Sequence, residues 1–352
     1  MRKINIQYAK PDMTLARDII TDTGIILLVR GIALSQNLIN KLATLHITTI
    51  FVEDPLYEGI IAPEYISLEL QQQALSVLST VLQTLKNKGT LNVQPVIQLS
   101  TQIVEELMCN PKTSICLNEI MTHDDPTFSH SLNCAIYAIL LGQFNGLNYP
   151  DLKELAAGAL LHDIGKNDIS TTLLNKPDKL SADEFELIKK HAQWGFEKLI
   201  VLHWDLSSLV AHMAWQHHEK MDGSGYPRGI GGNDILFHAR IVSIADVYEA
   251  LTANRPYRPA LSPKKAHDII QAGLGTHFDD ELGKLFLSKV ALYSPGTLVT
   301  INTGETALIV SIPPNNPKYP VIRIIKEPDG QPCKPYEIHL EEHPQIHIIN
   351  SQ

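Results

Sequence analysis

The sequence predicts a mainly α-helical protein with a small β-rich or mixed module at each end. Helical periodicity of the apolar residues dominates from about residue 97 to 293. Strand-like alternation marks residues 1–60, and nine prolines with β-branched runs mark residues 294–352. A helix and a linker are expected between the first two blocks, over residues 61–96. At 352 residues, the chain is long enough for two or three domains that each bury a core.

Composition and charge limit the classes of partner. The chain is 44% hydrophobic and 19% charged, as is typical of soluble globular proteins. Its net charge of −9 excludes a broad positive surface for duplex nucleic acid. No apolar run is long enough to span a bilayer or to form a signal peptide. The four cysteines form no Cys-x-x-Cys pair, so we expect reduced thiols and a cytoplasmic protein.

The first block, residues 1–60, is predicted to be an accessory or regulatory unit. Residues 25–29 are a candidate buried strand, Ser35 is a candidate N-cap of a helix, and residues 48–52 are a candidate last strand. The block carries no cluster of metal-ligand residue types. We therefore predict an accessory or regulatory role for this block and no metal site in it.

The next segment predicts one long helix over residues 64–88. Its apolar residues recur at spacings of three and four, and Gly89 follows the last of them. Such a face packs within its own chain or pairs with a second chain, so a homodimer through this helix stays open. Residues 89–95 then interrupt the pattern and are expected to be a linker.

The central block, residues 97–293, places His and carboxylate residues where predicted helices begin or end. A helix that starts at Asp125-Pro126 carries His130, and one that starts at Asp151 runs into His162-Asp163. Ser181 and Glu184 have the form of a capping box. They open the helix that bears His191. Helices over about 206–217 and 235–252 carry the remaining residues of this kind, His217, His218 and Asp246.

This set contains more His and carboxylate residues than one ion needs. A two-metal centre, with ions about 3.5–4 Å apart, would use such a surplus to activate water against a phosphodiester. His and carboxylate without thiolate favour iron, manganese, nickel or zinc and disfavour a structural Cys-type zinc site. A lone His is more often a surface or hydrogen-bonded core residue. Four histidines are left in that class: His203, His212, His238 and His277.

Three further features suit a phosphate ester as substrate. Lys166, one turn after His162, would neutralise a phosphate oxygen or assist the leaving group, unless it is a solvated surface Lys. The Gly-rich run 222–227 predicts a substrate lip in which Tyr226 offers a ring to a base or ribose; a plain loop is the alternative. Arg255 and Arg258 would form a phosphate fork, or surface salt bridges. The three tryptophans are predicted to be core residues.

The last block, residues 294–352, predicts a small β module. Its strands are expected at 297–301 and 321–325, with turns at Thr303-Gly304 and Asp329-Gly330.

Together the central motifs resemble the HD-GYP family, a subgroup of the HD-domain metal-dependent phosphohydrolases. The resemblance covers residues of about 120–290. It rests on the segments 162–166, 191–195, 217–220, 222–227, 239–246 and 251–258. It implies an HD-domain helical bundle that hydrolyses the bacterial second messenger cyclic di-GMP to linear pGpG, and in some members on to GMP.

The resemblance also implies residue roles. The metal ligands would be His162, Asp163 as the bridge between the ions, His191, His217, His218 and Asp246, with His130 at the rim. Lys166 would act with Asp163 at the scissile phosphate, where a metal-bridging hydroxide attacks phosphorus in line. Gly225, Tyr226 and Pro227 would shape the substrate lip, and Arg255 and Arg258 would hold phosphates.

The resemblance implies a binuclear centre with iron favoured and manganese or nickel as alternatives. Family members with three ions have a Glu four residues before the histidine that matches His130. Here that position is Pro126, which has no ligand oxygen, so two ions are expected. Asp124 or Asp125 is a candidate substitute.

Two other functions remain open. A cyclic di-GMP sensor without turnover would have a broken ligand set, and here the set is intact. An HD phosphohydrolase for another cyclic dinucleotide is the second alternative, which an assay distinguishes. A structural scaffold would leave the clustered ligands unexplained.

Overall fold

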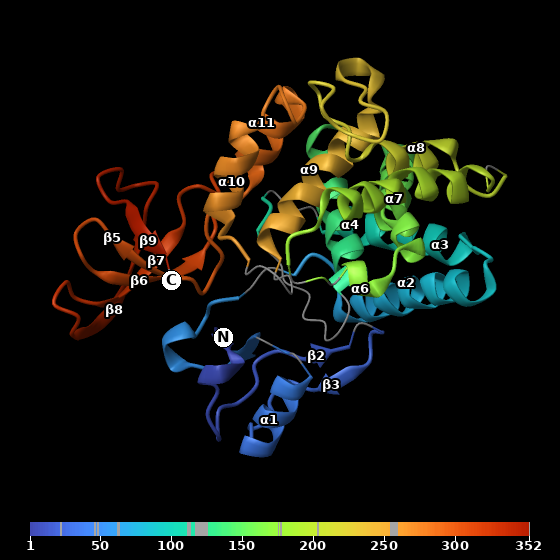
Figure 1. Cartoon of the computed structure of the whole chain (residues 1–352). Helices are drawn as coiled ribbons and strands as arrows, with labels where there is room; N and C mark the ends of the chain where they lie inside the picture. Colours follow the sequence, from blue (N-terminus) through green and yellow to red (C-terminus); the bar gives the residue numbers. More distant parts are fainter. Residues whose placement is uncertain are drawn as a thin grey trace.

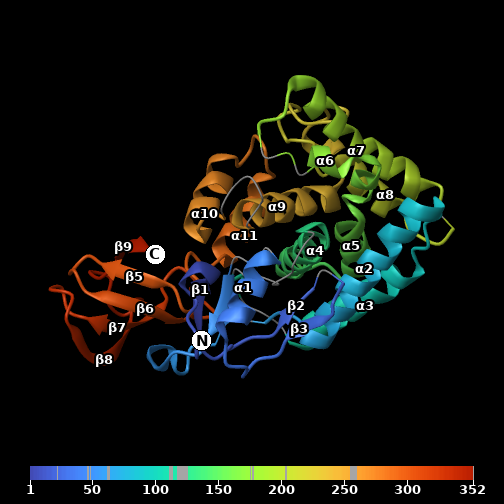
Figure 2. The same ribbon diagram turned by 60° about the horizontal axis from the view of Figure 1, so that its bottom comes forward.

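The computed structural model describes residues 1–21, 23–45, 47, 49–61, 64–110, 114–116, 126–174, 176, 178–202, 204–253 and 260–351. A small N-terminal unit, a large helical domain and a C-terminal sheet follow one another along the chain (Figure 1). A second view shows the C-terminal sheet beside the N-terminal unit, away from α7 and α8 (Figure 2). The predicted class, mainly α with small β-containing units at both ends, is confirmed. No helix among these residues is both long and apolar enough to cross a membrane.

The N-terminal unit contains two short antiparallel pairs and one helix. Strand β1 (Arg2–Asn5) pairs with β4 (Thr49–Val52), and β2 (Ile19–Ile20) pairs with β3 (Ile26–Leu28). Helix α1 (Gln36–Thr44) begins after Ser35, whose hydroxyl accepts from the backbone N–H of Leu38, as predicted. Two 3-10 turns, η1 (Ile6–Tyr8) and η2 (Pro55–Tyr57), complete it.

The prediction that residues 25–29 form a buried strand is wrong about burial. Ile25 and Val29 are 64% and 47% exposed. The reason is that β3 belongs to a two-stranded sheet at the surface, paired with β2. The core of this unit forms instead around Leu15, Leu34 and Ile50, which are almost fully buried.

The helical domain contains most of the chain. Its first helices are α2 (Leu68–Lys88), α3 (Gln94–Cys109), α4 (Pro126–Phe144) and α5 (Tyr149–Leu161). They are followed by η3 (Ile164–Asp168), α6 (Thr171–Leu174), α7 (Ala182–Ile200) and α8 (Ser208–Gln216). The last are η4 (Gly232–Asp234), α9 (Phe237–Thr252), α10 (Pro263–Ala272) and α11 (Asp280–Lys289).

Within the helical domain, one predicted helix start is confirmed and another lies earlier than predicted. The capping box of Ser181 and Glu184 opens α7 as predicted. Helix α5, expected to begin at Asp151, begins earlier because the Asn148 side chain accepts from the N–H of Asp151, and Pro150 occupies the first turn. Asp125 lies outside the described residues.

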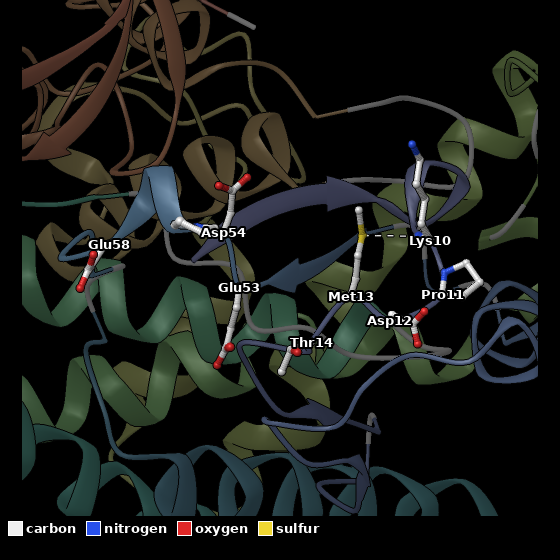
Figure 3. A pocket seen from close by; sticks show the side chains of 9 residues that line it. Lys10, Pro11, Asp12, Met13, Thr14, Glu53, Asp54 and Glu58 are labelled. Carbon is white, nitrogen blue, oxygen red and sulfur yellow. Dashed lines mark hydrogen bonds between the residues drawn. The ribbon is translucent and has the colours of Figure 1, made fainter. Parts of the chain in front are cut away.

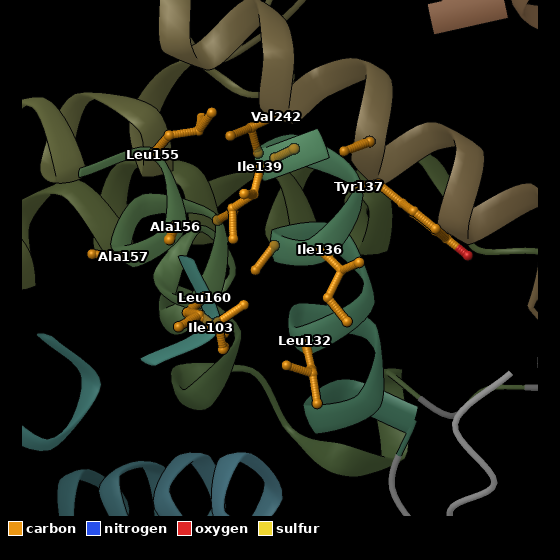
Figure 4. Close-up of a cluster of buried hydrophobic side chains, with 14 of the residues drawn as sticks. Ile103, Leu132, Ile136, Tyr137, Ile139, Leu155, Ala156, Ala157, Leu160 and Val242 are labelled. Atoms are coloured by element: carbon orange, nitrogen blue, oxygen red, sulfur yellow. The ribbon is translucent and has the colours of Figure 1, made fainter. Parts of the chain in front are cut away.

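Helix α4 is the centre of the domain. Every residue from Phe128 to Gly142 is buried, as expected of a helix with neighbours on all sides. Figure 4 shows its side chains Leu132, Ile136 and Ile139 packed among side chains of α3, α5 and α9. Burial of one Leu or Ile contributes about 1.5–3 kcal/mol, so this core holds the site-bearing helices in place.

Helix α2 places its apolar face in the same core. Its buried residues include Leu70, Ala74, Leu78, Val81 and Leu85. This face is therefore occupied within the chain, and a homodimer through this helix would have to use another face. Gly89, with φ of 66°, ends the helix, and α3 follows after a short link.

The tryptophans are less buried than predicted. Trp204 is 89% exposed in the turn between α7 and α8. Trp194 and Trp215 are half-buried. The core is filled by aliphatic side chains and by Tyr137, Tyr248 and Phe286 instead.

The C-terminal unit is one antiparallel sheet of five strands in the order β8-β7-β6-β5-β9. These are β5 (Leu298–Ile301), β6 (Thr306–Ser311), β7 (Val321–Lys326), β8 (Pro332–His339) and β9 (Ile348–Ser351). Gly304 and Gly330 have φ of 101° and 82° in the two predicted turns.

The two end units contact each other. The Arg323 guanidinium on β7 donates to the carbonyls of Leu56 and Glu58, at 3.2 and 2.8 Å. One small apolar cluster joins Tyr57 and Ile60 to residues of β6 and β7, Leu308 and Ile325. Segments from opposite ends of the sequence thus share a buried surface.

Candidate metal and catalytic site

The structure brings all seven predicted metal-ligand residues together inside the helical domain. They come from α4, α7, α9 and the ends of α5 and α8, and form two groups with one added Cys. Within each group, one ligand atom per residue lies within 4.8 Å of the others. The first group is His130, Cys134, His162 and Asp246; the second is Asp163, His191, His217 and His218.

Asp163 lies between the two groups. Its Oδ1 is 3.4 Å from His191 Nε2 and 3.7 Å from His217 Nε2. Its Oδ2 is 3.4 Å from His162 Nε2 and 3.5 Å from His130 Nε2. One carboxylate therefore faces ligands of both groups, each oxygen toward a different one.

Asp246 faces the same cluster from α9. Its Oδ1 is 3.2 Å from His130 Nε2 and 3.9 Å from His162 Nε2. Its Oδ2 is 3.9 Å from His218 Nδ1. The two aspartates thus approach the histidines from different helices.

Backbone carbonyls fix the orientation of three of the imidazoles. Nδ1 of His162, His191 and His217 donates to the carbonyl three residues earlier, at 2.7, 2.6 and 2.9 Å. A protonated Nδ1 leaves the Nε2 lone pair free, and in all three rings Nε2 is directed into the cluster. Such outer hydrogen bonds are typical of metal-ligating histidines.

His130 is oriented by a carboxylate that sequence reasoning missed. Its Nδ1 is hydrogen-bonded to Glu249, which is 4% exposed and lies one turn after Asp246 on α9. The Cys134 thiol, one turn along α4, is 3.6 Å from the same nitrogen. The signal available in the sequence was helical spacing, because Glu249 follows Asp246 by three residues and Cys134 follows His130 by four. Burial raises the pKa of Cys134 to about 12, so it is a neutral thiol in the metal-free protein.

The cluster fits divalent metal ions. Nε2 of His162 and Oδ1 of Asp163 are buried and have no hydrogen-bond partner. Leaving such a group unsatisfied costs about 1–3 kcal/mol. Imidazole nitrogen and carboxylate oxygen are ligands of iron, manganese, nickel and zinc, so an ion would satisfy both atoms.

The electrostatics set the protonation states that metals require. Burial lowers the pKa of His191 to about 3 and also lowers the pKa values of His217 and His218. Burial opposes ionisation of Asp163, but Lys166 and His162 hold the pKa of Asp163 well below its usual value. At neutral pH these imidazoles are neutral and this carboxylate is charged, which is the ligand-competent state.

The metal-free protein is expected to lose stability as the pH falls from about 6.5 toward 3. His191 titrates near 6.5 when unfolded and near 3 when folded, so only the unfolded state binds a proton in that window. The full shift corresponds to on the order of 5 kcal/mol. His217 and His218 act in the same direction. The raised pKa of His130 changes stability mainly above pH 6.5, where its stabilising effect is lost as the pH rises, so it has little influence in this window.

Urea unfolding of chelator-treated protein at pH 7 and pH 5 tests this expectation. The unfolding midpoint should drop at pH 5, and His191→Gln should show a smaller drop because the titrating ring is gone. An equal midpoint at both pH values would contradict it.

The predicted substrate lip lies against the cluster. The Tyr226 ring is 4.7 Å from the ring of His218. A Cβ on Gly225 would lie 2.5 Å from Cα of Glu219, so only Gly fits there.

A buried carboxylate holds the loop that forms the lip. Glu219 is buried and accepts hydrogen bonds from the backbone N–H groups of Arg228 and Ile230, at 2.7 and 3.2 Å. Pro227 follows Tyr226 through a cis peptide bond.

Of the predicted phosphate-binding cations, the structure places Lys166. Its ammonium contacts Asp163 Oδ2 at 2.5 Å, and its side chain is 28% exposed. The ammonium is therefore close to the cluster, on a side chain that is partly exposed. Arg255 and Arg258 lie outside the described residues.

A separate hollow of about 750 Å³ lies in the N-terminal unit. Figure 3 shows Glu53, Asp54 and Glu58 along it, with Lys10 and Asp12 toward the other end. Its lining contains carboxylates and one Lys but no His. It does not offer the ligand set of the helical cluster, which is the better candidate site.

Comparison with known proteins shows which protein families match the helical domain and the C-terminal sheet. Residues 116–282 match a family model described as HD domain. Residues 116–282 of this chain are therefore an HD domain. This match confirms the predicted HD domain, and such domains are metal-dependent. Residues 298–351 match a model described as a KOW domain associated with HD domain, which corresponds to the five-stranded sheet.

Several proteins resemble the HD domain in sequence. A cyclic di-GMP phosphodiesterase of Pseudomonas aeruginosa is 33% identical over 214 residues, 60% of this chain and 51% of that protein. A 3′3′-cGAMP-specific phosphodiesterase of Vibrio cholerae is 40% identical over 155 residues, 44% of this chain and 33% of that protein. The chain thus spans about half the length, or less, of these curated relatives.

Among solved structures, Bd1817 from Bdellovibrio bacteriovorus, described as an HDG"Y"P protein, gives a TM-score of 0.48 at 17% identity. The match covers 81% of this chain and 97% of that chain.

Proposed function

We propose that this chain is a metal-dependent phosphodiesterase of the HD-GYP type that hydrolyses cyclic di-GMP. The observation that carries the proposal is the buried cluster of five histidines and two aspartates, with Asp163 between its two groups. The similarity to phosphodiesterases of cyclic dinucleotides supports it.

The two groups of residues are the proposed ligands of two divalent ions, with iron favoured and manganese or nickel as alternatives. His130, His162 and Asp246 would hold one ion, and His191, His217 and His218 the other, with Asp163 serving both. Bound ions would activate water and stabilise negative charge on phosphate.

The other residues act on the substrate directly. Lys166, at the accessible side of Asp163, would place its ammonium beside a phosphate oxygen and stabilise the charge that develops there. Gly225, Tyr226 and Pro227 would shape the wall of the substrate site, and Arg255 and Arg258 would hold phosphates. Linear pGpG is the proposed product, with GMP as a further product.

The proposed division of the chain has four parts. Residues 1–60 form an accessory or regulatory unit, 61–96 a helix and linker, 97–293 the catalytic HD domain, and 294–352 a β-rich unit. The contacts of Arg323 with the N-terminal unit support a joint role for the two end units.

A second candidate function is hydrolysis of a mixed cyclic dinucleotide. It is favoured by the 40% identity to a 3′3′-cGAMP-specific phosphodiesterase. Both substrates would place a phosphodiester at the same cluster. They differ in one base, which the substrate lip would have to accommodate.

Product chromatography tests the proposal. Protein loaded anaerobically with iron, manganese or nickel is incubated with cyclic di-GMP or with 3′3′-cGAMP. We expect a linear product from the wild type and none from His162→Ala. His347→Ala is the matched control, because His347 is exposed in the C-terminal unit. Binding of cyclic di-GMP without product under every loading would favour the sensor instead.

A further inference from the structure

A second aromatic ring and a cation extend the wall of the site beyond Tyr226. Phe185 and Lys189 are four residues apart on α7, so they share one face of the helix. The rings of Phe185 and Tyr226 lie 6.4 Å apart at an interplanar angle of 79°. Lys189 Nζ is 4.9 Å from the Phe185 ring centroid and 5.6 Å from that of Tyr226.

This trio continues directly from the metal-ligand cluster. The Tyr226 ring is 4.7 Å from the ring of His218 and 6.4 Å from the ring of His191. His191 is itself on α7, less than one turn after Lys189. The same helix thus carries a proposed metal ligand and the two side chains that border the lip.

Exposure shows that the trio is not ordinary core. Phe185 is 44% exposed, although its ring has aromatic and cationic neighbours. The Lys189 side chain is 27% exposed, and its ammonium donates to Glu186, whose side chain is 66% exposed. Such a surface pair contributes only about 0–1 kcal/mol, so a phosphate can compete for the ammonium.

We propose that Phe185 and Lys189, together with Tyr226, form a nucleobase subsite for a purine of the cyclic dinucleotide. The subsite rests on the proposed function and specifies how the site holds its substrate. The exposed Phe185 ring stacks on the base, and the Lys189 ammonium neutralises the phosphodiester that is not cleaved. A chain with a net charge of −9 needs local cations to bind a dianion.

The expected energies are large enough to measure. Base stacking on an aromatic ring contributes about 1–3 kcal/mol per base, so removing the Phe185 ring should raise KM by about tenfold. Because the ring acts on bound substrate and not on the reacting phosphate, kcat should stay within about twofold.

Four variants of the metal-loaded, full-length protein test the subsite. Phe185→Ala is compared with Leu187→Ala, another exposed apolar residue of α7, and Lys189→Met with Lys190→Met, an exposed neighbour. We expect a higher KM for the first member of each pair, with unchanged kcat and unchanged melting temperature. A KM equal to that of the control, or a lower melting temperature with unchanged KM, would overturn the subsite and indicate a structural contact.

A binding measurement separates this inference from the proposed activity. If the wild type cleaves no cyclic dinucleotide, the proposed hydrolysis fails, and titration with fluorescently labelled cyclic di-GMP then decides the subsite. Weaker binding by Phe185→Ala than by Leu187→Ala would support it even then. Absence of binding by the wild type would overturn both.

Discussion

Replacing Asp163 by Asn is expected to lower the rate of cyclic di-GMP hydrolysis by about 10³-fold or more and to release bound metal. Asp163 faces His191 and His217 with one oxygen and His162 with the other, so the substitution weakens both ligand groups. It also removes the negative charge that the Lys166 ammonium contacts. Loss of charge stabilisation at one position of an active site typically costs about 10²–10³ in rate, and here the ions are weakened too.

The measurement is the initial rate together with metal content by mass spectrometry. Asp205→Asn is the control, because Asp205 is exposed in the turn after α7. Full metal content and wild-type rate in Asp163→Asn would contradict the role of Asp163 between the two groups.

The second large effect is expected for Gly165→Ala, in the turn that follows Asp163. A Cβ there would lie 2.0 Å from the carbonyl oxygen of His191 and 2.6 Å from the backbone nitrogen of Gly195. Both atoms belong to the backbone on the buried face of α7 and cannot move aside cheaply, so η3 and α7 would have to separate. We expect destabilisation by about 4 kcal/mol or more, measured by chemical denaturation, with loss of metal.

Gly195→Ala provides a matched control on the facing helix. Its Cβ would be 3.4 Å from Cβ of Ala214, an ordinary contact, and Ala is favoured over Gly in a helix by about 1 kcal/mol. This variant should be as stable as the wild type or more stable. Equal losses for both glycines would show that the close approach of η3 to α7 does not limit stability.

The clustering of the candidate metal ligands was predictable because these residues carry local signals. His162-Asp163 and His217-His218 follow predicted helices, and the capping box places the start of α7 before His191. The periodicity of the apolar residues was sufficient to predict a mainly α-helical protein. The resemblance to a known family then supplied the proposed roles, which spacing leaves open.

Glu249 and Cys134 were not predicted because their importance depends on which helices pack together. Both are unremarkable in sequence, and only the packing of α4 against α9 brings them to His130. The predicted burial of residues 25–29 was wrong for a similar reason. An apolar run in the sequence does not show whether another element packs against the strand. Phe185 and Lys189 were likewise invisible until the Tyr226 loop was placed beside them.

The shared surface of the two end units restricts how the chain can be shortened. Leu308 and Ile325 are covered partly by Tyr57 and Ile60, and Arg323 binds carbonyls of the same N-terminal segment. A fragment that begins after residue 60 would keep the sheet but uncover its apolar side. Fragments for expression should therefore retain both end units or remove both. Truncation at one end alone would combine the loss of a proposed regulatory unit with the exposure of an apolar surface.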